Sequence, residues 1–286
     1  MKCFYHNADL DGHCSGAIVK YKYPECEMIG INYGDTFLWD RINKGETVFM
    51  VDFCLQPFED MERLNSMCKL IWIDHHKSAI VEAERRNFVA SGGQKLEIGK
   101  GACELCWEYL FPNEKLPLGI ELLGRYDVWD LDYDPYVLPF QYGMKSRDTD
   151  PASYDRDVSV DWRNIFLNHV NFLEKCIEEG KTILRYIQKE NKKYVKQYCF
   201  KTEINGIPAL AVNKGLANSQ LFDSIWDISK HPIVITFVWH RDKWTVSLYT
   251  TVETGIDVSE IAKSYGGGGH KCAAGFQCKE LPFRLG

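Results

Sequence analysis

Carboxylate and imidazole side chains gather at four places in the first 130 residues of this sequence. These residues are His6, Asp9 and Asp11, then Asp52, then Asp74, His75 and His76, and finally Asp127. Carboxylate oxygens and imidazole nitrogens together suit divalent metals of borderline to hard character, such as manganese. Each group alone has an ordinary explanation, but several of them buried together would be costly without a cation. The residue types therefore predict a metal centre.

Six of these residues are candidates for direct ligands. They are His6, Asp9, Asp11, Asp52, His75 and Asp127. This number suffices for two cations if one carboxylate bridges them. Two cations about 3.5–4 Å apart stabilise the attacking and leaving oxygens of an in-line displacement at phosphorus. The predicted chemistry is hydrolysis of a phosphoric ester, and Asp130 is a second candidate for the position given to Asp127.

Four consecutive glycines near the end of the chain form a different kind of cluster. Gly267, Gly268 and Gly269 of this run are followed by His270 and Lys271, and then by small and apolar residues. Backbone N–H groups of such a run can surround an anion, and the two side chains add cationic donors. The alternative is a flexible linker, which rarely continues into a His-Lys pair and an apolar segment. We expect these five residues to bind a phosphate or carboxylate of the substrate.

Short apolar runs alternate with helical patterns in the first half of the chain. Strands are expected at residues 2–5, 28–32, 47–52 and 69–74, and helices at 15–21, 58–67, 102–110 and 116–123. This alternation predicts a parallel sheet covered by helices on both faces. Ligands of such sheets gather at the carboxyl ends of the strands. Because His6, Asp52 and Asp74 close three of the four strands, their side chains should meet at one edge.

The second half of the chain changes its pattern twice. Residues 127–161 are rich in Asp, Pro and Tyr and predict a loop, whereas 162–198 have apolar residues at helical spacing. Strands are then expected at 207–212, 233–239 and 245–250, and a helix at 259–265. We therefore predict an α/β protein in three parts. They are a metal-binding domain at 1–155, a helical connector at 156–200 and a smaller α/β substrate-binding domain at 201–286.

Composition limits the partners of this chain. Its 286 residues are enough for two domains, each with its own hydrophobic core. A net charge of -6 argues against a general nucleic-acid coat, though a local cationic pocket for one short phosphodiester remains open. The eleven cysteines are scattered, no secretory signal precedes them, and no apolar run could span a bilayer. We expect a reduced, cytoplasmic protein without a membrane partner, and an exposed helical connector would suit a homodimer.

With these motifs, the sequence resembles the DHH phosphoesterase superfamily over nearly its whole length. Asp74-His75-His76 resembles the motif that names the family, and Asp52 and Asp127 resemble its second and fourth motifs. His6, Asp9 and Asp11 resemble the first motif. The glycine run resembles that of the DHH-associated C-terminal domain, which binds substrate. Its presence favours the nucleotide-cleaving branch over the inorganic pyrophosphatases.

The resemblance implies a role for each residue. One Mn²⁺ would be held by His6, Asp9 and Asp52, and a second by Asp11, Asp52, His75 and Asp127. Mg²⁺ or Co²⁺ could substitute. His76 would donate a hydrogen bond or a proton at the substrate phosphate, while Asp74 would orient a ligand histidine. Gly268, Gly269 and His270 would hold the terminal nucleotide, and Arg125 is a further candidate for contact with phosphate.

The implied activity is a manganese-dependent phosphodiesterase, resembling an oligoribonuclease or exonuclease, that hydrolyses short oligonucleotides or dinucleotides with metal-activated water. Alternatives are a 3′-phosphoadenosine 5′-phosphate phosphatase, a cyclic-dinucleotide phosphodiesterase and a nucleotide-binding module that does not cut. A pure binder has no need of six metal ligands. Two features depart from the family pattern. His6, Asp9 and Asp11 have the spacing H-x-x-D-x-D, which differs from that of relatives. Tyr249 stands where relatives often have an arginine that binds phosphate through two hydrogen bonds.

Overall fold

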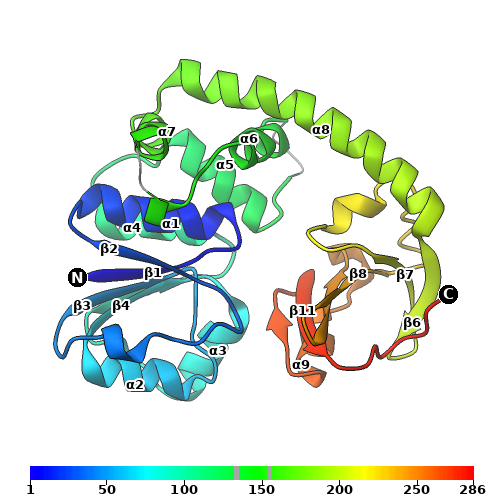
Figure 1. Cartoon of the computed structure of the whole chain (residues 1–286), viewed down its shortest axis with the longest axis horizontal. Helices are drawn as coiled ribbons and strands as arrows, with labels where there is room; N and C mark the ends of the chain where they lie inside the picture. The colour runs from blue at the N-terminus through cyan, green and yellow to red at the C-terminus, as the bar shows by residue number, and fades with distance from the viewer. Residues whose placement is uncertain (132–134, 154–155) are drawn as a thin grey trace. The chain divides into compact units, whose positions relative to one another are not determined.

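The computed structural model describes residues 1–131, 135–153 and 156–286, which form two compact units (Figure 1). The first unit is Met1–Leu184 and the second is Arg185–Gly286. The predicted mixed α/β fold, with an N-terminal parallel sheet and a smaller C-terminal sheet domain, is confirmed. The units divide within helix α8 (Val170–Tyr198). Domain boundaries at 155 and 200 stay predictions, and residue 155 lies outside the described residues.

The first unit contains a five-stranded parallel sheet in the order β2-β1-β3-β4-β5. Its strands are β1 (Lys2–His6), β2 (Glu27–Ile31), β3 (Thr47–Val51), β4 (Lys69–Asp74) and β5 (Gly93–Leu96). The four predicted strands are present with ends shifted by at most one residue. Strand β5 was not predicted because Gly93–Leu96 lacks an apolar run. Tyr5 pairs with Val51, and Val51 with Ile73, so β1, β3 and β4 end side by side.

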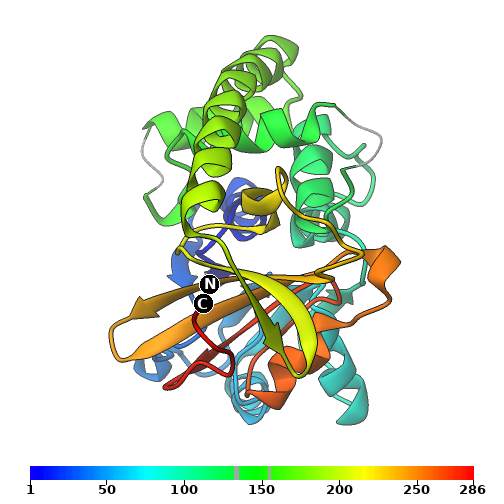
Figure 2. The ribbon, with the colours of Figure 1, turned by 90° about the vertical axis from the view of Figure 1, so that its right-hand side faces the viewer.

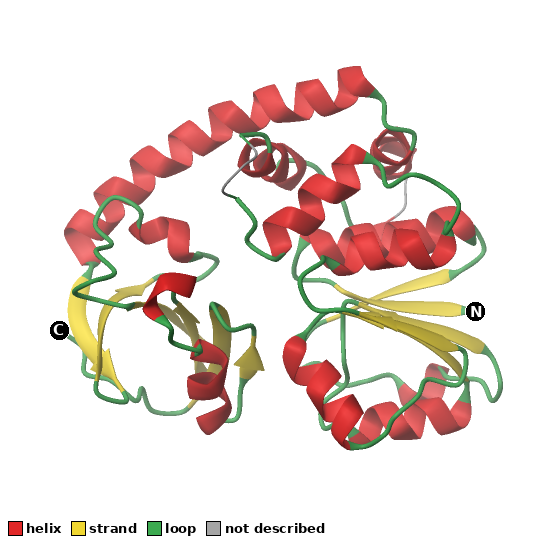
Figure 3. Cartoon of the chain, turned by 180° about the vertical axis from the view of Figure 1, so that it is seen from behind, coloured by secondary structure: helices red, strands yellow, loops and turns green. Residues whose placement is uncertain are grey.

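Helices cover both faces of this sheet (Figure 3). One face carries α1 (Leu10–Lys22), α4 (Ala102–Leu110) and α5 (Leu118–Asp127), and the other carries α2 (Glu59–Met67) and α3 (Lys77–Arg85). Successive strand side chains point to opposite faces. Ile71 and Ile73 accordingly join the core beneath α1 and α4, while Leu70 and Trp72 join the core on the α2 side. A short 3₁₀ turn, η1 (Trp39–Arg41), lies between β2 and β3.

The prediction of a loop over 127–161 is wrong for much of its length. The segment contains α6 (Val137–Lys145), η2 (Pro151–Ser153) and the start of α7 (Arg156–Phe166). Pro139 and Gly143 conceal the helical spacing of α6. Proline is tolerated in a first turn, where the missing N–H has no intrahelical partner. Gly143 is needed because a Cβ there would lie 2.0 Å from the carbonyl oxygen of Cys176.

The second unit contains a six-stranded sheet in the order β10-β11-β9-β8-β7-β6 (Figure 2). Its strands are β6 (Phe200–Ile204), β7 (Ile207–Asn213), β8 (Ile233–His240), β9 (Lys243–Tyr249), β10 (Gly268–Gly269) and β11 (Ala273–Cys278). Only the β7–β8 pair is parallel among the described strands of this sheet. The unit also contains η3 (Ser219–Phe222), η4 (Val252–Thr254) and α9 (Val258–Ser264). Strands β6, β10 and β11 were not predicted, since glycines and polar residues interrupt their apolar pattern.

Within the described ranges, no helix is long and apolar enough to cross a bilayer. All eleven cysteines are free thiols, and most of them are buried. Cys103 and Cys106 lie in the core on α4.

Candidate metal centre

The turn between β1 and α1 brings His6 and Asp9 together. Asp9 is the N-cap of α1, and its Oδ1 accepts a hydrogen bond of 2.9 Å from the N–H of Gly12. Its other oxygen, Oδ2, lies 3.0 Å from Nδ1 of His6. The turn requires a glycine at position 12, because a Cβ there would lie 2.0 Å from the carbonyl oxygen of His6. The spacing of the first motif is thus accommodated by a tight capping turn.

Asp11 is held by the N-terminus of helix α4. Its Oδ2 accepts a hydrogen bond of 2.7 Å from the N–H of Ala102, and its Oδ1 one of 2.9 Å from Cys103. Amides at a helix N-terminus favour a negative charge. Each carboxylate oxygen has further lone-pair capacity, so these bonds fix Asp11 without excluding a metal ligand role. No local pattern in the sequence indicated that α4 would contact this residue.

Asp52 lies at the centre of the cluster. Its Oδ1 is 3.2 Å from Nε2 of His75 and 3.8 Å from Nδ1 of His76, while its Oδ2 is 3.5 Å from Nδ1 of His6. Asp52 has a left-handed backbone with φ 53°. Such strain in a residue other than glycine is concentrated at functional sites. Its Oδ1 is buried and, within the part of the chain that the structure describes, accepts no hydrogen bond.

Asp74 organises the turn that follows β4. Its Oδ1 accepts hydrogen bonds from the N–H groups of His75 and His76, at 2.7 and 3.0 Å. The same oxygen lies 2.7 Å from Nδ1 of His76. A proton on Nδ1 is thereby directed to the carboxylate, which orients the imidazole. The side chain that Asp74 orients is thus that of His76, whereas His75 contacts it through its backbone.

His75 and Asp127 complete the cluster. Nε2 of His75 lies 3.2 Å from Oδ2 of Asp127 and 3.6 Å from Oδ2 of Asp11. Asp127 is the last residue of α5. The rival residue Asp130 instead accepts a 3.0 Å hydrogen bond from Nε of Arg125. The structure therefore brings Asp127 rather than Asp130 to the cluster, and it places the Arg125 guanidinium in an ion pair.

The charges of the cluster repel one another in the absence of a cation. Burial and the neighbouring Asp52 raise the pKa of Asp11 to about 6. Burial and Asp11 raise the pKa of Asp127 well above its usual value. The pKa of His75 is also raised, because the attraction of Asp52, Asp127 and Asp11 outweighs the effect of burial. A divalent cation among these oxygens would remove the repulsion.

The donor atoms fit metal ions. Three triplets of the first unit have ligand atoms within 4.8 Å of one another. They are His6, Asp9 and Asp52, then Asp11, Asp52 and His75, and then Asp52, Asp74 and His76. The first two triplets consist of residues proposed as ligands, and they share Asp52. An arrangement of imidazole and carboxylate donors around one shared carboxylate suits two divalent ions.

Tyr33 is a neighbour of this cluster that the sequence patterns did not identify. The centre of its ring lies 4.4 Å from the ring centre of Phe53, 5.6 Å from that of His6 and 6.5 Å from that of His76. Tyr33 follows β2, whose end lies at the same edge of the sheet. Its position just past a strand end was the only available signal, and a single tyrosine in a loop is too common to be informative.

Two of the four glycines of the run in the second unit lie in a strand. Gly268 and Gly269 form β10 and pair with Gly275 and Ala274 of β11. The N–H groups of Gly266, Gly267 and His270 donate to carbonyl oxygens of the same unit. Gly267 is required by packing, since a Cβ there would lie 2.0 Å from the carbonyl oxygen of Gly275. The amides of Gly266, Gly267 and His270 are therefore used within the unit, and anion binding by Gly268, Gly269 and the side chains of His270 and Lys271 stays a prediction.

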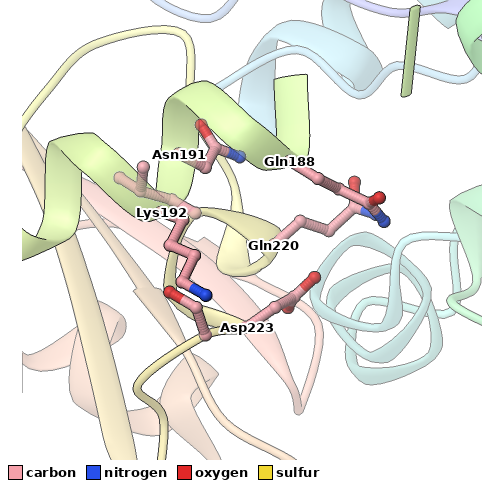
Figure 4. Close-up of a pocket in the computed structure, with 7 residues that line it drawn as sticks. Gln188, Asn191, Lys192, Gln220 and Asp223 are labelled. Atoms are coloured by element: carbon pink, nitrogen blue, oxygen red, sulfur yellow. The ribbon is translucent and has the colours of Figure 1, made fainter. Parts of the chain in front are cut away.

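Two other features of the second unit bear on the predicted substrate site. The hydroxyl of Tyr249 donates a 3.1 Å hydrogen bond to the carbonyl oxygen of Ala217, so it is used within the fold. A cavity of about 230 Å³ lies between α8 and the η3 turn (Figure 4). It is lined by Gln188, Asn191, Lys192, Gln220, Leu221, Asp223 and Ser224. None of the residues predicted to bind substrate lines this cavity.

Comparison with known families identifies the second unit. Residues 212–283 match the model of the DHHA1 domain. The oligoribonuclease NrnB of Bacillus subtilis (strain 168) is 27% identical over 100% of this chain and 75% of its own length. An uncharacterized protein, R106, of Acanthamoeba polyphaga mimivirus is 24% identical over 95% of this chain. The chain spans 66% of the length of that viral protein.

Solved structures share the fold. The DHH domain of a member of a ribosomal-protein family has a TM-score of 0.53 at 16% identity, covering 96% of this chain and 81% of its own. The pGpG-specific phosphodiesterase PggH of Vibrio cholerae has a TM-score of 0.51 at 14% identity, covering 96% and 92%. At these identities the likeness concerns the fold alone.

Proposed function

We propose that this chain, which belongs to the DHH phosphoesterase superfamily and has a C-terminal DHHA1 domain, hydrolyses phosphodiester bonds of short oligoribonucleotides with two Mn²⁺ ions. The superfamily consists of phosphoric-ester hydrolases. The observation that carries the proposal is Asp52. This one strained, buried carboxylate lies within 3.8 Å of three imidazoles, and each of the two proposed ligand triplets includes it.

The ligand roles follow from which atoms are neighbours. His6, Asp9 and Asp52 would hold one ion. Asp11, Asp52, His75 and Asp127 would hold the other, and Asp52 would belong to both ligand sets. When bound, the metal pair lowers the pKa of a water molecule and offsets charge on the reacting phosphate. The amides of α4 and the capping turn at Asp9 keep the ligands in place before any ion arrives.

His76 is proposed to donate a proton to the leaving oxygen. Burial lowers the pKa of His76, but the attraction of Asp74 raises it more, so the net shift is upward from 6.5. This shift increases the share of His76 that carries the proton at a given pH. Because Nδ1 faces Asp74 at 2.7 Å, the proton available to substrate is the one on Nε2. Asp74 acts as the positioning residue for this imidazole.

The relatives favour a short ribonucleotide as substrate. NrnB, which resembles the whole of this chain over 75% of its own length, is named an oligoribonuclease. PggH, which shares the fold, is named a pGpG-specific phosphodiesterase. The net charge of -6 also suits a small substrate better than a long duplex. His270 and Lys271 are the proposed cationic donors of the DHHA1 domain, and manganese is the proposed metal.

The proposal is tested by product analysis. The purified chain is incubated in Mn²⁺ with labelled RNAs of two to seven nucleotides, with 3′-phosphoadenosine 5′-phosphate and with cyclic dinucleotides. We expect mononucleotides from the RNAs, and no turnover after chelation. Faster turnover of the bisphosphorylated nucleoside or of a cyclic dinucleotide would assign the site to the corresponding alternative activity.

A matched pair of variants tests whether hydrolysis occurs at the cluster around Asp52. His75→Ala should abolish hydrolysis, because its Nε2 contacts three carboxylates. His240→Ala removes an exposed imidazole at the end of β8 and should leave hydrolysis unchanged. Normal turnover by a folded His75→Ala protein in Mn²⁺ would show that the reaction occurs elsewhere. Nucleotide binding without turnover in the unsubstituted chain would favour a binding module.

A further inference from the structure

Lys145 lies beside the metal cluster in an aromatic environment. It is the last residue of α6, and its Nζ lies 5.2 Å from the centre of the Tyr126 ring and 5.6 Å from that of Tyr142. Tyr126 immediately precedes Asp127, the cluster residue that ends α5. Two aromatic faces thus attract and orient an ammonium next to the proposed metal ligands.

Among the described residues, this ammonium has no acidic partner. No carboxylate oxygen of the described residues lies within 4.0 Å of Nζ of Lys145, the distance that an ion pair requires. Two other cations of this unit are paired, since Arg125 contacts Asp130 and Arg147 contacts Asp161 and Glu179. Lys145 as a whole is exposed, so an anion from solvent can reach it, although neighbouring groups partly desolvate its ammonium. An ammonium held between two rings without a counterion is therefore available for a charged hydrogen bond to such an anion.

The electrostatics of the site agree with such a role. Desolvation lowers the pKa of Lys145, and the nearby carboxylate of Asp9 acts in the opposite direction. Five carboxylates, those of Asp9, Asp11, Asp52, Asp74 and Asp127, surround the three imidazoles. Metal ions would offset this charge at their own position. A second phosphate of the substrate would still need a cation outside the ligand cluster.

We propose that Lys145 binds the phosphate next to the scissile one and so favours substrates with a terminal phosphate. This inference rests on the proposed function. Lys145 is assigned to a neighbouring phosphate because, among the described residues, it makes no ion pair with Asp9 or Asp127 and so is not one of the cluster residues. A charged hydrogen bond contributes about 1.5–3 kcal/mol, which corresponds to roughly 10- to 100-fold in binding.

The experiment compares two substrates that differ in one phosphate. These are the diadenylate pApA, with a 5′-phosphate, and ApA, without it. Lys145→Gln should raise KM for pApA about 10- to 100-fold, with kcat changed much less, and should leave kcat/KM for ApA within about threefold. Where ApA turnover is too slow to follow, its inhibition constant against pApA hydrolysis takes its place. Lys145→Arg keeps the charge and should recover most of the preference for pApA.

Lys22 provides a matched control. Its Nζ lies 4.6 Å from the Phe111 ring, so Lys22→Gln also removes a lysine held over an aromatic face. Lys22 is at the opposite end of α1 from Asp11, and its substitution should change neither substrate. Equal losses on pApA and ApA, or no loss on pApA, would overturn the inference. If the unsubstituted chain cleaves neither in Mn²⁺, the proposed function fails and the inference fails with it.

Discussion

The Asp74-His75-His76 turn and the glycine run of the DHHA1 domain were both predicted to be functional. They differ in how far their polar groups are satisfied within the fold. The turn joins a cluster in which carboxylates repel one another and Oδ1 of Asp52 is buried without a hydrogen bond from a described residue. In the glycine run, by contrast, the N–H groups of Gly266 and Gly267 donate within the unit, and Gly268 and Gly269 form a strand.

The difference shows that buried charged groups without partners in the fold indicate a binding site better than a sequence motif does. The carboxylates around Asp52 repel one another, so a bound cation would stabilise the cluster. Two amides of the glycine run, those of Gly266 and Gly267, are already used within the unit, and Gly267 is explained by the close approach of the Gly275 carbonyl. Four consecutive glycines therefore need not mean four amides available to a ligand.

The largest expected effect comes from the shared carboxylate. Asp52→Asn keeps the shape and tolerates the left-handed backbone, but removes the charge between the two proposed ions. We expect hydrolysis to fall by at least about 10³-fold, since metal-assisted stabilisation is worth several kcal/mol. The measurement is kcat/KM on a short RNA in Mn²⁺. Asp40→Asn, at an exposed position, is the control, and equal activity of both variants would contradict the comparison.

Substitution in the glycine run should act on stability instead. Gly267→Ala places a Cβ 2.0 Å from the Gly275 carbonyl oxygen and should lower the free energy of unfolding by about 3 kcal/mol. Gly266→Ala meets nothing within 4 Å but has φ 79°, so about 1 kcal/mol is expected. Urea unfolding of both variants measures the difference. Equal, small losses would show that packing does not explain Gly267.

Metal binding should stabilise the folded chain. At a free Mn²⁺ concentration of about 100 times Kd, one site adds about 2.7 kcal/mol to the free energy of unfolding. We expect a rise in Tm on adding Mn²⁺ to chelator-treated protein, and little rise in Asp52→Asn. A similar rise in both proteins would mean that the ion binds at another place.

The smallest effect concerns a buried acid near the cluster. Burial raises the pKa of Glu104 to about 7 from 4.5, although its Oε2 accepts a 2.9 Å hydrogen bond from the N–H of Gly101. The stability that protonated Glu104 contributes is complete below pH 4.5 and is lost as the pH rises through 7. Glu104→Gln should therefore gain about 1–3 kcal/mol at about pH 8 and almost nothing at about pH 4.5.

The pH test uses urea unfolding at the two pH values. Glu114→Gln, at an exposed position, should show no difference between them. A pH-independent effect of Glu104→Gln would mean that folding does not raise the pKa of this carboxyl group.

The edge of the parallel sheet could be predicted because strand ends at His6, Asp52 and Asp74 are visible in the sequence. Parallel pairing then forces these residues to one side. Contacts made across the chain could not be predicted in this way. Neither the α4 amides that hold Asp11 nor the ring of Tyr33 near His76 follows from local pattern.

Helix α6 and its last residue show a second limit. Pro139 and Gly143 hide the helical pattern, and the need for Gly143 is set by Cys176, which lies 33 positions further along the chain. Lys145 therefore looked like one charge in a polar loop. Its relation to Tyr126 depends on the packing of two helices, which only coordinates provide.

The left-handed backbone at Asp52 restricts how this position can change over evolutionary time. Only glycine, asparagine and aspartate adopt that conformation readily. Descendants of this chain that drift away from catalysis should therefore keep the same strand end and acquire asparagine or glycine here. A homologue with either residue at this position would be a candidate for a non-hydrolytic nucleotide sensor, recognisable before any assay is performed.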